Sequence, residues 1–417
     1  MPTTAGRRAI VIGGSVGGLF AANLLLRRGW DVRVYDRVPG SLESRGTGIA
    51  HHPETEAILA RAGARDAQAP GVRVGGRVAV GPDGSILASE RYPQYVTAWG
   101  RVFNPLRLAF QAERMRMGME LRGLEQDADQ VTARFADGSS ATAELLVGAD
   151  GFRSAVRAAV APAVVPVYCS YVGWRGLVEE AAFSPRFAPV FAQFTYLFPG
   201  HGEFIGYPIP GLNDSAEPGR RRYNFLWYYP LDAGAPLDDV LTDAAGIRHA
   251  FSIAPGLLRP EHVAAVRADA AARLPEPYAE AVRRAEGFLV QPIYELESPA
   301  MGFGRVALLG DAAFTARPHV GVGVLKAAED AEALAEALDA APSGAAVPAA
   351  LAAYSARRLP PSRAAVAVSR HLGTFIERRL PRPDADPALG LTLQRLLELS
   401  GRPVAPIRHA AGHGNAD

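Results

Sequence analysis

The chain has 417 residues, and 48% of them are hydrophobic, which is enough to fill the cores of two domains. Lys and Arg together number 44 against 43 Asp and Glu, so the formal net charge of +1 argues against a nucleic-acid or anionic-membrane partner. The single cysteine, Cys169, excludes an internal disulfide and a cysteine metal cluster, and no apolar run approaches the roughly 20 residues of a membrane span, so we expect a soluble, cytoplasmic protein without a metal site.

The first 36 residues predict a strand, a glycine-rich turn, a helix and a second strand. The apolar strand 9–12 leads into the turn Gly13-Gly14-Ser15-Val16-Gly17-Gly18, not into the cleavage site of a signal peptide. The helix is expected over 19–28 and the second strand over 31–35. Such a turn directs backbone N–H groups at a pyrophosphate, although Ser15 replaces the usual second glycine. Asp36, 18 residues after Gly18, can accept a hydrogen bond from a ribose hydroxyl.

Shorter elements are expected between residues 46 and 157. The pattern predicts a helix over 54–62, a hairpin from 72 to 89 that turns at Pro82-Asp83-Gly84, and a second hairpin that turns at Asp137-Gly138. A strand over 145–147 then runs into Gly148-Ala149-Asp150-Gly151, and Ser154 can cap a helix that carries Arg157. Two interpretations of Asp150 and Arg157 stay open here, a ligand site or an ordinary capped turn.

From about Val167 to Pro292 the sequence becomes rich in aromatic residues that alternate between two faces. This pattern predicts a mainly antiparallel sheet. Helices are expected over about 237–251 and 275–285.

A second motif of nucleotide type follows the apolar strand 306–309. It reads Gly310-Asp311-Ala312-Ala313 and continues in a turn rich in Pro and Gly as far as Gly323. An acid followed by small residues and such a turn suits the ribityl chain and the isoalloxazine edge of FAD better than NAD. Asp36, Asp150 and Asp311 each follow a strand, which is hard to explain as coincidence.

Together these elements predict an α/β protein. It has a Rossmann-like FAD-binding domain, an inserted, mainly antiparallel β-sheet substrate domain, and C-terminal helices. The FAD-binding domain is expected over 1–166 and 293–339, the substrate domain over 167–292, and the C-terminal helices and tail over 340–417. Within these parts we expect one helix from 323 to 338, another to about 379, and an unstructured end of the tail.

The motifs, in this order, resemble the flavin-dependent aromatic hydroxylases of the single-component type over residues 8 to about 375. Longer segments are similar to a subgroup that acts on hydroxylated pyridines and that also has a serine in the glycine turn. These segments are 45–49, 171–176, 207–211, 224–228, 310–313 and 317–319.

The resemblance implies FAD as the bound cofactor and NADH or NADPH as a reductant that docks transiently. It further implies a C4a-hydroperoxyflavin that transfers oxygen from O2 to an electron-rich hydroxypyridine or phenol-like ring. By the same resemblance the residues that would contact FAD are Gly13, Ser15, Gly18, Asp36, Arg45, Asp150, Arg157, Asp311, Pro318, Gly321 and Gly323.

Some positions depart from the family pattern. Phe314 stands where histidine is frequent, and Gly321-Val322-Gly323-Val324-Leu325 replaces the usual Gly-Gln-Gly-x-Asn. Phe103 replaces the family's helix arginine, with Arg101 and Arg107 nearby. The flavin contacts of the second turn are therefore expected to come largely from the backbone.

The substrate pocket must exclude water and offer a base to the hydroxyl of the ring. We predict Phe204, Tyr207, Trp227, His51 and His52 as its substrate-binding residues, and Tyr207 and His319 as its catalytic residues. Each aromatic side chain can equally belong to the sheet core, and each histidine to the surface. A flavin-dependent reductase or dehydrogenase, or a non-catalytic flavin-binding protein, stays open as an alternative, as does homo-oligomer formation.

Overall fold

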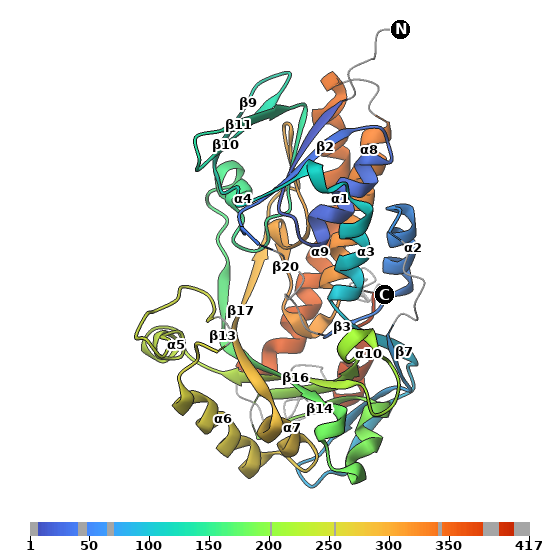
Figure 1. Cartoon of the computed structure of the whole chain (residues 1–417), viewed down its shortest axis with the longest axis vertical. Helices are drawn as coiled ribbons and strands as arrows, with labels where there is room; N and C mark the ends of the chain where they lie inside the picture. The colour runs from blue at the N-terminus through green and yellow to red at the C-terminus, as the bar shows by residue number, and fades with distance from the viewer. Residues whose placement is uncertain are drawn as a thin grey trace, which may run out of the picture.

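The computed structural model describes residues 7–40, 48–64, 71–200, 202–253, 256–340, 344–377 and 392–403. Two large sheets lie at opposite ends of the long axis of the molecule (Figure 1). The long helix α9 (Val347–Glu377), from the C-terminal part of the chain, contacts both sheets. The architecture is α/β, as predicted.

The first large sheet has six strands in the order β18-β19-β12-β1-β2-β8. Its bounds are β18 (Gly302–Phe303), β19 (Val306–Leu308), β12 (Leu145–Gly148), β1 (Arg8–Ile12), β2 (Asp31–Asp36) and β8 (Met115–Met117). All neighbours pair in parallel except β18 and β19. The carboxyl ends of β19, β12, β1 and β2 therefore lie side by side at one edge.

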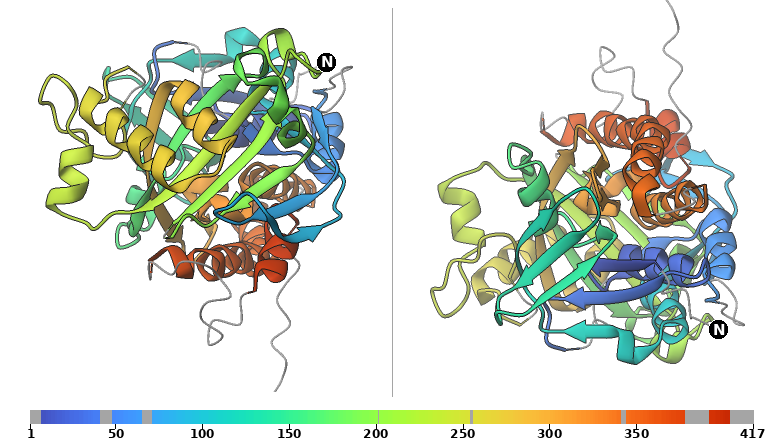
Figure 2. Two further views of the ribbon diagram at one scale, coloured as in Figure 1. Left: turned by 90° about the horizontal axis from the view of Figure 1, so that it is seen from below. Right: turned by 90° about the horizontal axis from the view of Figure 1, so that it is seen from above.

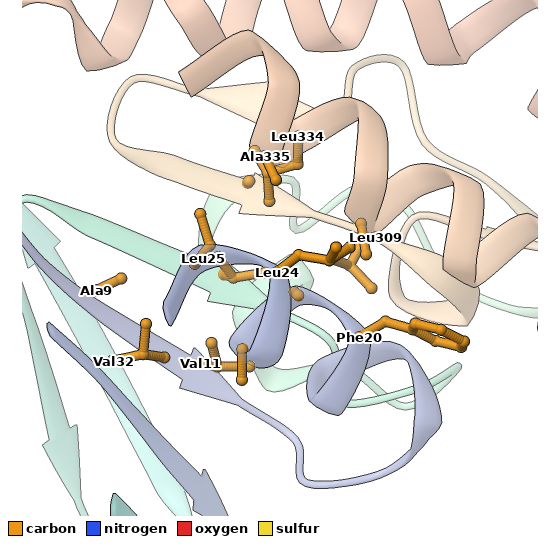
Figure 3. Packing of buried hydrophobic residues seen from close by; sticks show 14 of the residues in the cluster. Ala9, Val11, Phe20, Leu24, Leu25, Val32, Leu309, Leu334 and Ala335 are labelled. Atoms are coloured by element: carbon orange, nitrogen blue, oxygen red, sulfur yellow. The ribbon is translucent and has the colours of Figure 1, made fainter. Parts of the chain in front are cut away.

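Helix α1 (Val16–Leu26) packs between this sheet and α8 (Gly323–Asp339). Leu24 and Leu25 of α1 point toward α8, while strand residues lie on the other side of α1 (Figure 3). Burial of each such leucine contributes roughly 1.5–3 kcal/mol. The helix begins three residues earlier than predicted, so Gly18 lies in its first turn. Glycine is required there, because a Cβ would lie 1.9 Å from the carbonyl oxygen of Gly13.

The second large sheet has eight strands in the order β20-β17-β13-β16-β15-β14-β5-β6. Its bounds are β20 (Phe314–Thr315), β17 (Glu286–Glu297), β13 (Val167–Glu179), β16 (Arg222–Pro230), β15 (Glu203–Ile209), β14 (Phe194–Leu197), β5 (Arg77–Val80) and β6 (Ile86–Glu90). The sheet is antiparallel except where β14 pairs with β5. The hairpin of β5 and β6 comes from the section assigned to the FAD-binding domain. The predicted boundary at residue 167 therefore does not hold for these two strands.

The two faces of the eight-stranded sheet have different covers. One face packs against α5 (Ala235–Val240), α6 (Pro260–Arg273) and α7 (Tyr278–Arg284), as the left view of Figure 2 shows for α6 and α7. The other face packs against α9 (Val347–Glu377), α10 (Leu393–Leu399) and the turn after β20. We call the second one the α9 face.

The helix predicted over 237–251 is wrong in length. Helix α5 ends at Val240, because the carboxylate of Asp243 accepts hydrogen bonds from the N–H groups of Ala245 and Ile247 and turns the chain there. Helix α6 was not predicted from its alanine-rich sequence. It places Val266 and Ala270 in the core between the sheet and α5, α6 and α7.

The remaining elements are small. Two three-stranded sheets are β11 (Ser140–Ala143), β10 (Val131–Phe135) and β9 (Leu121–Gln126), and β3 (Gly48–Ala50), β7 (Gln94–Ala98) and β4 (Val72–Val74). Short α-helices are α2 (Pro53–Arg61), α3 (Gly100–Ala109) and α4 (Ala155–Val160). Both predicted hairpins are confirmed, except that 72–74 form a strand of another sheet.

Short 3-10 helices complete the described chain. They are η1 (Ala112–Arg114), η2 (Glu180–Ala182), η3 (Pro185–Ala192), η4 (Leu212–Asp214), η5 (Gly310–Ala312), η6 (Pro318–Val320) and η7 (Gly344–Ala346). The predicted helix from 323 to 338 is confirmed as α8. The predicted unstructured end of the tail lies outside the described residues. Of the helices that the structure describes, none is both long and apolar enough to cross a membrane.

Candidate active site

The carboxyl edge of the six-stranded sheet brings the three predicted acids together. Asp36 ends β2, Asp150 follows β12, and Asp311 follows β19, while the glycine turn follows β1 between the first two. Four adjacent parallel strands thus deliver all of these groups to one edge.

The glycine turn is tied to the end of β2. Gly13 has φ +107° and donates its N–H to the carbonyl of Tyr35 at 2.8 Å. The buried carboxylate of Asp36 accepts from the N–H groups of Gly14 at 2.7 Å and Val38 at 2.8 Å. Ser15 precedes α1, but its hydroxyl makes no capping hydrogen bond and no acid lies in the first turn. The positive end of α1 therefore faces the edge without a side-chain cap.

Asp150 makes the capped turn that was one of its two interpretations. Its carboxylate accepts from the hydroxyl of Ser154 at 2.5 Å and from the N–H of Ala155 at 2.7 Å. Ser154 in turn caps α4 through the N–H of Arg157. The buried guanidinium of Arg157 donates to the carbonyl of Ala312 at 3.0 Å, so this motif supports the loop that carries Asp311.

The Asp311 side chain is exposed, while the backbone beside it is fixed by a buried ion network. Gly310 has φ +60°, its N–H donates to Asp330 at 3.0 Å, and its carbonyl accepts from Lys326 at 2.9 Å. Asp330 also pairs with Lys326 at 3.0 Å and accepts from Arg358 at 2.7 Å. Sequence reasoning missed this network, although Lys326 and Asp330 stand four residues apart on one helix face.

We expect Asp330→Asn to lower the free energy of unfolding by about 3 kcal/mol, because it removes the buried carboxylate that Lys326 and Arg358 share and leaves Arg358 paired only with Glu329. The Asp330 side chain is 0% exposed. Urea unfolding followed by circular dichroism measures the change. Glu332→Gln, on the same helix but at the exposed Arg61 pair, is the matched control and should cost no more than about 1 kcal/mol. Equal losses in the two variants would contradict the role assigned to the network.

Hydrogen bonds from several other segments hold the turn after β20 in place. Arg317 donates its N–H to the hydroxyl of Ser369 at 3.1 Å, and the ring Nε2 of His52 lies 3.1 Å from the carbonyl of Gly321. Gly401 donates its N–H to the carbonyl of Val320 at 2.9 Å. Gly321 has φ +69°, and a Cβ there would lie 2.8 Å from Gly401.

Pro318 opens η6 within this turn, and Gly323 opens α8 at its end. A Cβ at Gly323 would meet no atom within 4 Å, and α8, like α1, has no side-chain cap. The N-terminus of α8 is thus a second helix N-terminus without a side-chain cap at this edge of the six-stranded sheet.

The two predicted catalytic residues lie on the α9 face, and both are buried. Tyr207 donates its hydroxyl to the carbonyl of Gly48 at 2.8 Å, and burial raises its pKa to about 12. The Nε2 atom of His319 lies 2.9 Å from the hydroxyl of Tyr171. Burial, assisted by the charge of Arg317, lowers the pKa of His319 to about 3. At neutral pH the tyrosine is protonated and the histidine is uncharged.

Phe204 and Trp227, which were predicted to line the substrate pocket, lie on the opposite face of the sheet from Tyr207. Side chains alternate along β15, so Phe204 points away from the face that carries Tyr207. It is paired across the sheet with Trp227, and its ring lies 5.9 Å from that of Tyr278 in α7. Both residues belong to the core under α6 and α7.

The remaining predicted site residues are dispersed. Nε2 of His51 lies 3.4 Å from the carboxylate of Glu56, and burial lowers the pKa of His51 and of His52. His52 is 3% exposed and contacts the turn through Gly321. Arg101 donates to the carbonyl of Asp214 at 3.2 Å. Arg45 lies outside the described residues.

Comparisons with known proteins agree with this geometry. A family model described as FAD binding domain-like matches residues 168–295, and one described as FAD binding domain matches residues 295–369. The chain is 35% identical over 345 residues to 2,6-dihydroxypyridine 3-monooxygenase of Paenarthrobacter nicotinovorans, covering 80% of this chain and 83% of the relative. It is 31% identical to 3-amino-4-hydroxybenzoate 2-monooxygenase of Streptomyces cremeus, covering 85% and 83%. The solved structure of 2,6-dihydroxypyridine-3-hydroxylase from Arthrobacter nicotinovorans superposes with a TM-score of 0.83 at 32% identity, covering 90% of this chain and 94% of the other.

Proposed function

Because this chain belongs to the family of FAD-dependent aromatic hydroxylases, we propose that it uses NADH or NADPH and O2 to hydroxylate an electron-rich hydroxypyridine or phenol-like ring. The observation that carries the proposal is the carboxyl edge of the six-stranded sheet. There an uncapped helix start and the exposed carboxylate of Asp311 lie close to a turn that packs on a tyrosine-rich sheet face.

The residues at this edge fit FAD. The unpaired N–H groups at the start of α1 would hold the pyrophosphate, with Gly13 and Gly18 keeping the backbone close. Asp36 already accepts two backbone N–H groups and retains lone pairs for a ribose hydroxyl. Asp311 would accept from a hydroxyl of the ribityl chain. When bound, FAD supplies acceptance of a hydride from the reductant and activation of O2.

The chain's own residues would orient the ring and keep water out. Pro318 and Gly321 lie in a turn whose backbone is fixed by hydrogen bonds from other segments, so they would offer a rigid backbone surface to the isoalloxazine. Tyr207 keeps its proton at neutral pH and would therefore act as a hydrogen-bond donor rather than as a base. A substrate whose hydroxyl is already acidic, such as a dihydroxypyridine, needs the least help from a base.

The choice of a hydroxypyridine rests on the 35% identical relative, whose name states that it acts on 2,6-dihydroxypyridine. A flavin-dependent reductase of the same fold is the alternative, since the same edge would serve it equally well. Tyr207 and the buried His319 favour neither function by themselves.

The test is an oxygen-transfer assay with purified, flavin-loaded protein. We expect 2,6-dihydroxypyridine or a related phenol to stimulate NADH or NADPH oxidation and to gain one oxygen atom, detected by mass spectrometry after reaction under 18O2. Oxidation of the nicotinamide cofactor without labelled product would identify a reductase. A protein that binds no flavin at all would overturn both enzymatic functions.

A further inference from the structure

Glu203 has a buried carboxyl group to which the function proposed above assigns no role. It begins β15 on the α9 face, its side chain is 1% exposed, and neither of its oxygens has a hydrogen-bond partner among the described residues. Nδ1 of His319 lies 3.7 Å from Oε2 of Glu203. That Nδ1 atom also has no hydrogen-bond partner among the described residues. A small movement of either side chain would satisfy both.

The other ring nitrogen of His319, Nε2, contacts Tyr171. This atom lies 2.9 Å from the hydroxyl of Tyr171, and the two rings stack with centroids 5.8 Å apart. The ring of Tyr228 packs edge-on against His319 at 4.6 Å. A Cβ at Gly373 of α9 would lie 3.0 Å from Nε2 of His319, so glycine lets the helix cover these groups closely.

Charged groups surround this set, but most are already paired. Arg317 on the same turn donates to Glu295 of β17 at 2.8 Å, and Arg370 of α9 bonds the other oxygen of Glu295 at 2.8 Å. Other titratable groups on this face include Cys169 of β13, His52 beside the turn, and tyrosines of β14, β15 and β16 with two arginines beside them. These tyrosines and arginines are Tyr196, Tyr207, Tyr228, Arg77 and Arg175.

We propose that Glu203, His319 and Tyr171 form one proton-sharing chain whose two hydrogen bonds reverse direction when the chain loses a proton. In the protonated state the Glu203 O–H donates to Nδ1 of His319, and Nε2–H donates to the oxygen of Tyr171. On deprotonation the Glu203 proton moves to Nδ1 of His319, and the Nε2 proton moves to the oxygen of Tyr171. Tyr171 releases its own hydroxyl proton to solvent. Tyr171 then donates to Nε2, and His319 keeps one N–H throughout.

The acidities support this order of events. Burial raises the pKa of Glu203 to about 8, and burial together with Arg317 lowers the pKa of His319 to about 3. At neutral pH Glu203 is therefore the protonated member and His319 is uncharged. The chain loses its proton near pH 8.

This proton-sharing chain of Glu203, His319 and Tyr171 acts on the turn that carries His319. Pro318 and Gly321 would face the isoalloxazine, a consequence that rests on the proposed function. Glu203 and Tyr171 are then positioning residues, because they act through His319 and reverse the hydrogen bonds that hold this turn against the sheet.

The test is nitrogen NMR of the full chain labelled with 15N-histidine, without substrate. The sequence has nine histidines, and the signals of His319 are identified by their loss in His319→Gln. We expect the Nε2-protonated tautomer below pH 7 and exchange to the Nδ1-protonated tautomer with a midpoint near pH 8. Glu203→Gln should abolish the exchange, while Glu113→Gln, an exposed glutamate, should leave it unchanged.

A wild-type His319 that keeps one tautomer from pH 6 to pH 10 would overturn the proposal, and this titration needs no variant. Exchange that persists in folded Glu203→Gln would overturn it as well. Neither result depends on catalysis, so the chain and the proposed hydroxylation can fail separately. As a spectroscopic check on the flavin-loaded protein, the visible spectrum should change near pH 8 in the wild type but not in Glu203→Gln.

Discussion

Asp311→Ala is expected to yield a folded protein that no longer retains FAD through gel filtration. The wild-type carboxylate is exposed and makes no hydrogen bond to the described residues, so its removal should leave stability within about 0.5 kcal/mol. Hydrogen bonds to a charged group contribute about 1.5–3 kcal/mol, which corresponds to a Kd for FAD roughly 10-fold to 100-fold weaker. The ratio of flavin to protein absorbance, and quenching of flavin fluorescence during titration, measure this loss.

Two further variants sharpen the comparison. Asp311→Asn keeps an acceptor oxygen without the charge and should fall between wild type and Asp311→Ala. Asp129→Ala removes an exposed acid from the turn between β9 and β10 and should bind FAD like the wild type. Normal FAD affinity in Asp311→Ala would count heavily against the proposed position of the cofactor.

The stability of the protein is expected to depend strongly on pH through Glu203. Its pKa is raised from 4.5 to about 8 in the folded chain, so the folded state keeps a proton that the unfolded state releases. The stability that this group contributes is therefore complete below pH 4.5 and is lost as the pH rises toward 8. At roughly 1.4 kcal/mol per pH unit, the wild type should lose about 5 kcal/mol relative to Glu203→Gln over this interval.

His319 has the opposite sign. Its folded pKa of about 3 lies below the usual 6.5, so its contribution is lost as the pH falls from 6.5 to 3. The two slopes cancel between pH 4.5 and 6.5, and the wild type should be most stable there. Urea unfolding at a series of pH values measures the profile. An alkaline fall that is equally steep in Glu203→Gln would show that other groups cause it.

The carboxyl edge of the six-stranded sheet was predictable, because the sequence motifs that form it are each contained in a short segment of the chain. Gly13 to Gly18, Asp150 and Asp311 each follow a short apolar strand, and parallel pairing brings the ends of such strands together without further information. The positions of helices α1 and α8 followed from the same local patterns. Local turns were predictable for the same reason, as at Asp137-Gly138.

The interior of the site was less predictable, because it depends on which face of a strand is covered. Phe204 and Tyr207 lie three residues apart on β15 and therefore on opposite faces, and the sequence does not state which helices cover each face. Glu203 resembles any glutamate at the start of an exposed strand until β16 and the turn with His319 bury it. The roles of Asp330 and Gly401 depend on contacts across 20 and 81 residues of chain.

The hairpin of β5 and β6 has a consequence for engineering. Because β5 pairs with β14, the early part of the chain completes a sheet that is otherwise built from residues 167–315. A chimera that exchanged only residues 167–292 with a relative would graft a foreign β14 onto a resident β5. A functional exchange of this segment is therefore expected to need residues 77–90 as well, because they form the last two strands at one edge of the same sheet.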